Sequence, residues 1–235
     1  MSGCMNLPAK LLTELVGTFV FLSVIALFPG GGPAAALAPL AIGSALMVMV
    51  YMGGHVSGAH YNPAVSLGLF LRRRIDATTL AAYWVAQLVG GGLAFVAGYL
   101  MSGRTPGIHP GAGVFTASAL AVEVLFTAAL VLVVLNVAAT RATQGNSFYG
   151  LAIGFTIVAA AFVGGPISGG AFNPAVGVGA TLGSALFANG SWTDLWLYLV
   201  GPLAGGAIAA GVHLLQEGGV PAQEPEPAPA PAVAD

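Results

Sequence analysis

Charged side chains are scarce in this chain of 235 residues, since only 6% of its residues are Asp, Glu, Lys or Arg while 57% are apolar. A soluble domain carries about 25% charged residues, so this chain has too few to cover a surface that faces water. Its formal net charge of −2 also offers no basic stripe for phosphates, which argues against nucleic-acid binding. The composition therefore indicates a protein of the lipid bilayer.

Several kinds of chemistry are missing as well. The single cysteine, Cys4, excludes a disulfide within the chain. The sequence has no nucleophile paired with a base, no spacing typical of metal ligands and no glycine loop of the kind that holds phosphates. We therefore expect neither an enzyme nor a site for a metal or cofactor.

Six stretches are apolar for about 18 residues, which is enough helix to cross a hydrocarbon core roughly 30 Å thick. We place them near residues 11–28, 35–52, 77–101, 117–139, 148–163 and 194–215. Two other apolar pieces, Pro63 to Leu71 and Pro174 to Phe187, are too short to cross. A half-span must enter and return on one side, and irregular backbone is tolerated there only in protein or beside a wet cavity. These two pieces therefore predict an aqueous path.

The two halves of the chain repeat each other. The segment 58–65 returns as 169–176, so that Asn-Pro-Ala-Val occurs at Asn62 and again at Asn173, and Glu14 finds a counterpart in Glu123. Each half contains three spans, an odd number, so the second half is inverted relative to the first. The predicted fold is an all-α membrane protein with six transmembrane helices, two re-entrant half-helices and an inverted 3+3 repeat. We expect one channel domain over residues 1–215, with halves at 10–101 and 117–215, and a disordered Pro/Ala/Glu-rich tail over 216–235.

The Asn-Pro dipeptides predict where the half-helices begin. Asn is a favoured N-cap residue, and Pro63 and Pro174 have φ angles already suited to the first turn. Two helix N-termini, each with roughly half a positive elementary charge, would then meet at the membrane centre and repel cations. The side-chain amides of Asn62 and Asn173 have N–H donors for a passing oxygen atom.

The residues that precede each motif are expected to be extended, with carbonyl groups turned inward as acceptors. Donors at the centre and acceptors along the approaches predict a pore for small uncharged polar molecules. The expected carbonyl groups are those of Gly58, Ala59 and His60 in the first half and of Gly169, Gly170 and Ala171 in the second.

Glu14 and Glu123 lie inside predicted spans, where a carboxylate costs about 2.5 to 3.5 kcal/mol to insert. One interpretation is a proton relay. The other, which we favour because each half has one, is that each carboxylate braces an irregular loop by accepting backbone N–H bonds.

Lys and Arg residues predict the orientation in the membrane. Lys10, residues 72–74 and Arg141 fall on one side of the predicted spans, and Arg104 falls on the other. Because cytoplasmic loops carry an excess of Lys and Arg, the majority side is expected to be cytoplasmic, together with both termini. We expect the protein to lie in the cell membrane.

The paired Asn-Pro-Ala motifs, Glu14, Glu123, the segment 54–58 and Gly201-Pro202 together resemble the aquaporin, or major intrinsic protein, family over residues 10–215. Two such motifs at this spacing within six spans make the resemblance specific. It implies a passive channel for water or other small uncharged solutes, assembled as a homotetramer with one pore per subunit.

The resemblance also implies a selectivity filter on the external side, at positions counted from the two motifs. These positions hold Ile42, Ala161, Gly170 and Val176. The usual water-selective set has an aromatic residue, a His, a small or polar residue and an Arg, so Val176 stands where Arg is expected. We therefore expect the filter to be wider and to lack the outer positive barrier to cations. The apolar ring of these four residues also favours loss of water from the filter. Water, ammonia, hydrogen peroxide and small polyols all remain open as permeants.

Two other functions stay open at this level. A secondary transporter also uses inverted repeats and broken helices, and a membrane protein with a closed pore would have a purely structural role. Flux that does not saturate would distinguish a channel from a transporter, and absence of flux would favour the structural role.

Overall fold

The computed structural model describes residues 6–28 and 33–218, and in this part of the chain it is helical without strands. Six helices are long and apolar enough to cross a membrane. They are α1 (Leu7–Leu27), α2 (Ala38–Ser57), α4 (Ala77–Ser102), α5 (Thr116–Val134), α6 (Tyr149–Ser168) and α8 (Leu195–Gly218). Two short helices, α3 (Pro63–Leu71) and α7 (Pro174–Phe187), complete the arrangement. The predicted all-α membrane fold is confirmed.

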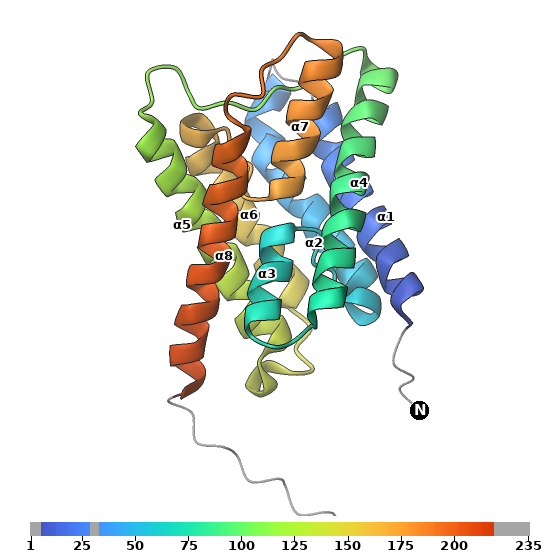
Figure 1. Ribbon diagram of the computed structural model, residues 1–235, viewed down its shortest axis with the longest axis vertical. Coiled ribbons are helices and arrows are strands. Elements are labelled where there is room, and N and C mark those ends of the chain that lie inside the picture. Colours follow the sequence, from blue (N-terminus) through green and yellow to red (C-terminus); the bar gives the residue numbers. More distant parts are fainter. Residues whose placement is uncertain (1–5, 29–32, 219–235) are drawn as a thin grey trace, which may run out of the picture.

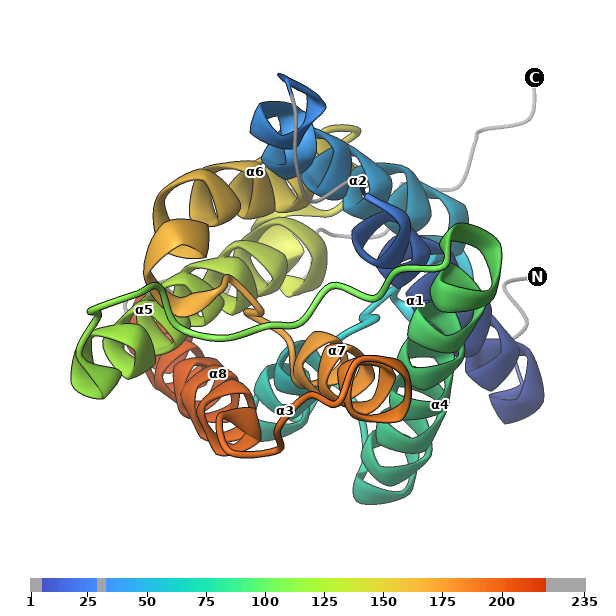
Figure 2. The same cartoon turned by 90° about the horizontal axis from the view of Figure 1, so that it is seen from above.

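The half-helices lie inside the bundle and enter from opposite ends. In Figure 1, α3 occupies the lower half and α7 the upper half, and in the view from above both lie within the group of long helices (Figure 2). α3 packs against α8 of the second half, while α7 packs against α4 of the first half. Each half of the chain thus provides a half-helix that is supported by a long helix of the other half.

Capping residues explain several helix ends. The side chains of Asn6 and Asp76 accept hydrogen bonds from the backbone N–H groups of Ala9 (3.0 Å) and Thr79 (2.7 Å) at the starts of α1 and α4. Glycine in the left-handed conformation ends α4 at Gly103, with a φ angle of 67°.

Most of the expected spans differ from the helices by a few residues at their ends. α6 continues through Pro166 to Ser168, five residues beyond the predicted end at position 163. A 3₁₀ turn, Pro33–Leu37, precedes α2, and a π-helical turn, Leu135–Ala139, continues α5. A second 3₁₀ turn follows at Arg141–Thr143.

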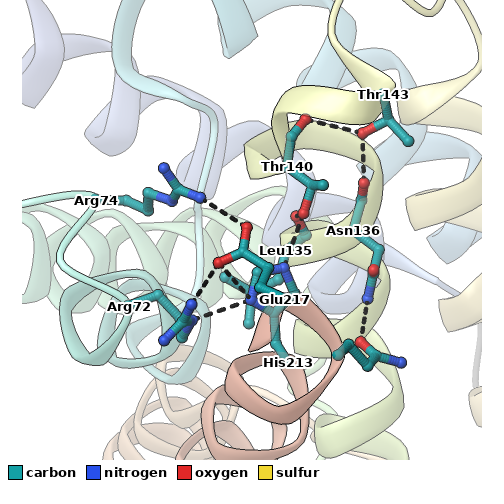
Figure 3. Close-up of polar contacts among 9 residues, drawn as sticks. Arg72, Arg74, Leu135, Asn136, Thr140, Thr143, His213 and Glu217 are labelled. Carbon is teal, nitrogen blue, oxygen red and sulfur yellow. Dashed lines mark hydrogen bonds and ion pairs between the residues drawn. The ribbon is translucent and has the colours of Figure 1, made fainter. Parts of the chain in front are cut away.

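The predicted disordered tail begins too early, because α8 extends to Gly218 and residues 216–218 are helical. The remainder of that predicted tail lies outside the described residues. Glu217 accepts hydrogen bonds from Arg72 and from Nη2 of Arg74 (3.1 Å), which follow α3 (Figure 3). His213 accepts a hydrogen bond at Nδ1 from Nε of Arg72 (3.0 Å). These contacts hold the last turns of α8 against the end of α3.

Candidate functional site

The first turns of α3 and α7 meet through the two asparagines. Oδ1 of Asn62 accepts a hydrogen bond from the backbone N–H of Ala64 (2.8 Å), and Oδ1 of Asn173 accepts one from Ala175 (2.9 Å). Nδ2 of Asn62 donates to the carbonyl oxygen of Phe172 (2.9 Å), on the other half of the chain. Each asparagine therefore caps its own helix with the oxygen and links to the opposite loop with the nitrogen.

The second link is equivalent, since Nδ2 of Asn173 donates to the carbonyl oxygen of Tyr61 (2.9 Å). The expectation that both amide groups are free is therefore wrong in part, because one hydrogen of each is already bonded. A side-chain amide has two N–H hydrogens, so each asparagine keeps a second one. The reason is that the two helix tips are close enough for each amide to reach the loop of the other half.

The loops before the motifs are not extended as expected. Gly58 and Ala59 have φ angles of 89° and 52°, and their counterparts Gly169 and Gly170 have 93° and 72°. The left-handed conformation costs an ordinary L-residue such as Ala59 about 1 to 2 kcal/mol. The backbone N–H of Ala59 donates to Oγ of Ser57 (3.0 Å), which holds the residue in place. Left-handed turns let the chain leave a long helix and reverse toward the half-helix within a few residues.

Glu14 is fully buried on α1 and accepts four hydrogen bonds. Its Oε1 accepts from Oγ of Ser57 (2.6 Å) and from the backbone N–H of His60 (2.9 Å). Its Oε2 accepts from the backbone N–H of Tyr61 (2.7 Å) and from Nε2 of Gln87 (2.8 Å). The carboxylate thus joins α1, α4 and the loop before α3.

Glu123 has the corresponding position on α5 but accepts three hydrogen bonds. Its Oε1 accepts from Oγ of Ser168 (2.7 Å) and from the backbone N–H of Ala171 (3.0 Å), and its Oε2 accepts from the backbone N–H of Phe172 (2.7 Å). The second half supplies no counterpart of Gln87 in these contacts. The two carboxylates are therefore equivalent in position and unequal in support.

His60 lies in the same buried group. Its Nδ1 is 2.9 Å from Oγ of Ser66, which also accepts a hydrogen bond from Nε2 of Gln87 (2.9 Å). A serine hydroxyl has one hydrogen and two acceptor lone pairs, so Oγ of Ser66 can either donate to Nδ1 or accept from it while it accepts from Gln87. The ring of Tyr83 packs edge-on against the His60 ring, with 5.1 Å between the ring centroids, and its hydroxyl donates to the carbonyl oxygen of Ser57 (2.7 Å).

A cavity of about 250 Å³ passes the tips of both half-helices, and its lining includes both asparagines. The four expected filter residues all line it: Ile42, Ala161, Gly170 and Val176. So do Ala59, His60, Gly169 and Ala171 from the expected carbonyl groups, whereas Gly58 does not. The structure therefore brings the two asparagines, the four filter residues and most of the expected carbonyl residues to one cavity. Gly58, at the end of α2, does not line it, and neither do the other predicted motif residues, Pro63, Ala64, Pro174 and Ala175.

The cavity lining is mainly apolar. Its polar side chains are His60, Tyr61, Asn62 and Asn173, and no Asp, Glu, Lys or Arg belongs to it in the described part of the chain. The hydroxyl of Tyr61 is already bonded to the carbonyl oxygen of Met49 (3.0 Å). Apart from backbone groups, the unused hydrogen-bonding capacity of the lining thus belongs mainly to His60 and the two asparagines.

Sequence reasoning missed the segment between α4 and α5, which crosses the upper end of the molecule (Figure 2). Pro106, Gly107 and Ile108 of this segment line the cavity. The backbone N–H of Gly111 donates to the carbonyl oxygen of Ile167 (3.0 Å), which fixes the segment to the end of α6. The sequence has no motif here that connects the segment with the two Asn-Pro-Ala motifs.

Comparisons with known proteins place this geometry among membrane channels. The family model described as major intrinsic protein matches residues 5–213. Aquaporin NIP1-1 of Zea mays is 38% identical over 74% of this chain and 60% of its own length. A glycerol uptake facilitator protein-like 6 of Lactiplantibacillus plantarum is 36% identical over 86% of this chain and 94% of its own length. Among solved structures, the aquaglyceroporin from Plasmodium falciparum has a similar fold, with a TM-score of 0.76 and 23% identity over 88% of this chain and 96% of that one.

Proposed function

The chain belongs to the major intrinsic protein family, and we propose that the cavity between α3 and α7 is its pore. As a member of this family it is a passive membrane channel for water and small solutes and not an enzyme. The observation that carries this proposal is the pair of reciprocal 2.9 Å bonds between each asparagine amide and the opposite loop. They hold two helix tips against one cavity at the centre of the molecule. A solute that follows this cavity passes both asparagines.

We propose that the tips of α3 and α7 exclude ions and protons. The N-terminus of each helix carries roughly half a positive elementary charge. Both tips face the same apolar cavity, which has no carboxylate in its described lining to offset them. A cation would lose most of its hydration where the potential is positive, while an uncharged solute would be little affected. The remaining amide hydrogens of Asn62 and Asn173 would donate to the oxygen of such a solute.

We propose that Ile42, Ala161, Gly170 and Val176 form the selectivity filter. Their side chains present no hydrogen-bonding group, so size is the main criterion at this level. With Val176 in the place of the expected Arg, the outer positive barrier is absent and the helix tips alone act on charge. This combination favours a wider range of uncharged solutes over a strict preference for water.

We propose that Glu14 and Glu123 brace the loops before the half-helices. The proposal is supported by the bonds that each carboxylate accepts from two consecutive backbone N–H groups and from the serine that ends the preceding helix. Carbonyl groups of Ala59, His60, Gly169, Gly170 and Ala171 would then line the approaches to the centre.

We propose a cell-membrane location with both termini in the cytoplasm, and a homotetramer with one pore per subunit. Lys10, Arg72 and Arg74 lie near the end of the molecule where α1 begins and α8 ends, and Arg104 follows α4 at the other end (Figure 1). The excess of basic residues at the first end supports its cytoplasmic placement. The tetramer rests on family membership.

Flux measurements on reconstituted vesicles test the proposal. We expect light-scattering transients for water and for small uncharged solutes that are faster than those of empty vesicles, with a low activation energy and no saturation. Saturable flux would indicate a transporter, and rates equal to empty lipid for every solute would refute the pore. We also expect that Val176→Arg restricts flux of the larger solutes, with Val176→Leu as an apolar control. Unchanged passage of glycerol through Val176→Arg would show that the filter is placed incorrectly.

A further inference from the structure

A basic pocket lies between the first turn of α1, the turn after α3 and the first turn of α4, and it shares no lining residue with the pore cavity. These helix ends lie at the lower end of the molecule in Figure 1. The pocket's volume of about 600 Å³ is in the range of small-molecule sites. We refer to it as the basic pocket. Lys10 of α1 lines one side, and Arg73 and Arg74 line the side formed by the turn after α3. Three cations from two parts of the chain thus surround one open cavity.

The end of α3 determines how its three arginines are divided. Arg73 has a φ angle of 56°, and its N–H donates to the carbonyl oxygen of Phe70 (2.8 Å), so the chain reverses at this residue. Arg72 lies against His213 and Glu217 of α8, as Figure 3 shows. Arg73 is exposed on the side of the basic pocket instead. If the three arginines served only to anchor the chain at the membrane interface, their charges would be sufficient. It would not matter that Arg72 bonds to α8 while Arg73 faces the basic pocket.

The charges of the pocket are only partly satisfied by the protein. Asp76 is its one acidic residue, and the backbone N–H of Thr79, bonded to that carboxylate, holds the pKa of Asp76 below its usual range. Arg74 shares its charge with Glu217 (3.1 Å). For the side chains of Lys10 and Arg73, the described residues provide no hydrogen-bond acceptor and no ion-pair partner within bonding distance. The pocket therefore has a net positive charge, with two cations available to an anion.

Apolar side chains form the rest of the lining. Phe70, Leu71 and Ile75 belong to it, and Leu71 is 44% exposed. They lie beside the end of membrane-spanning helices, where lipid headgroups meet acyl chains. A soluble anion would use the cations and leave these side chains uncovered. A ligand with an anionic head and an apolar tail matches both parts of the pocket.

We propose that the basic pocket binds an anionic phospholipid of the cytoplasmic leaflet. Its phosphate would be held by Lys10 and by the guanidinium group of Arg73, which can donate two parallel hydrogen bonds to phosphate oxygens. Its acyl chains would cover Leu71 and Phe70. A lipid bound in this way joins the first turn of α1 to the end of α3 and the turn that follows it. Because α3 has nine residues, its pore tip at Asn62 is only about 13 Å from this anchor.

Lipid binding to the purified full chain tests the proposal. We would titrate the protein in neutral detergent micelles with phosphatidylglycerol or phosphatidylcholine of the same acyl chains and count bound lipids by native mass spectrometry. Basic residues near a membrane surface each contribute about five-fold to the affinity for anionic lipid. We therefore expect phosphatidylglycerol to bind about 25-fold more tightly than phosphatidylcholine. The double variant Lys10→Gln/Arg73→Gln should lose this preference.

Arg104→Gln is the control for the single variant Arg73→Gln, because it removes one cation from the opposite end of the molecule and should keep the preference, whereas Arg73→Gln should lose part of it. Circular dichroism and monodisperse elution establish that each variant is folded. Equal binding of the two lipids, an unchanged preference in the double variant, or the same loss in Arg104→Gln as in Arg73→Gln would overturn the proposal. Displacement of phosphatidylglycerol by an equal concentration of inorganic phosphate would also overturn it, since the site would then recognise free phosphate.

Discussion

The unequal support of the two buried carboxylates gives the most direct test of the bracing proposal. Glu14 accepts four hydrogen bonds, two at each oxygen, whereas Glu123 accepts two at Oε1 and one at Oε2. Replacement by glutamine keeps the size of the side chain but leaves one acceptor oxygen and one NH₂ group. We predict that Glu14→Gln destabilises the protein more than Glu123→Gln.

The magnitude follows from counting the bonds lost. With Ser57 and Gln87 in their present donor roles, a glutamine at position 14 turns its NH₂ group toward two donors in either amide orientation and loses both bonds. A glutamine at position 123 can orient so that only the bond from Phe172 is lost. A hydrogen bond to a charged group contributes about 1.5 to 3 kcal/mol. The expected losses in free energy of unfolding are therefore about 3 to 6 kcal/mol for Glu14→Gln and about 1.5 to 3 kcal/mol for Glu123→Gln. For a chain of this size the difference corresponds to about 3 to 12 °C in melting temperature.

Melting of the purified variants in detergent, followed by circular dichroism, measures this difference. Gln87→Met provides the matched background, because it removes the fourth donor and leaves Glu14 with the same three kinds of donor as Glu123. In that background, Glu14→Gln should cost about as much as Glu123→Gln does in the unmodified protein. If Glu123→Gln melts at or below the temperature of Glu14→Gln, the carboxylates do not stabilise the loops through these bonds.

Two further substitutions test the supports of α3. A Cβ atom at Gly206 would lie 2.6 Å from the carbonyl oxygen of Ala64, so Gly206→Ala should lower the free energy of unfolding by about 1 to 3 kcal/mol and slow water flux. Gly211 has open space around it, so Gly211→Ala should change neither quantity. Equal melting temperatures of the two variants would contradict this packing. His213→Phe removes the ring nitrogens bonded to Arg72 and to Oγ1 of Thr140 (2.8 Å), so it should lower the free energy of unfolding by about 1 to 3 kcal/mol in the same melting assay. His213→Gln can restore one of these bonds and should therefore lower it less.

The sequence predicts the half-helices better than it predicts the long ones. Both half-helices have the predicted bounds because Asn-Pro fixes the first turn chemically. The ends of α6 were harder to predict, since Pro166 in a Gly-Gly-Pro sequence is typical of a break, yet the helix continues through it to Ser168. Apolar composition marks the middle of a span and varies little over the last turns, where a cap such as Gly169 decides the end.

Contacts between distant parts of the chain could not be predicted from the sequence. The bond from Asn62 to Phe172 joins residues 110 positions apart, and it removes a donor that the sequence assigns to the solute. Gln87 has no motif that connects it with Glu14. Tyr198, near the end of a span, is typical of a membrane-interface residue, but it is fully buried and donates to the carbonyl oxygen of Ser168 (2.7 Å). In each case the partner depends on how the halves pack.

The third residue of the motif shows how packing and sequence are connected. A Cβ atom at Gly91 of α4 would lie 2.8 Å from the carbonyl oxygen of Ala175. A Cβ atom at Gly206 of α8 would lie similarly close to the carbonyl oxygen of Ala64 in the other half-helix, at 2.6 Å. Both alanines are fully buried. Each half-helix thus begins against a glycine of the opposite half, and a larger residue on either side would move the asparagine that precedes it. Asn caps the half-helix and links the loops, Pro sets the first turn, and Ala allows close packing, so the motif specifies a position within the whole fold. That is why its repetition predicts the architecture more reliably than hydropathy alone.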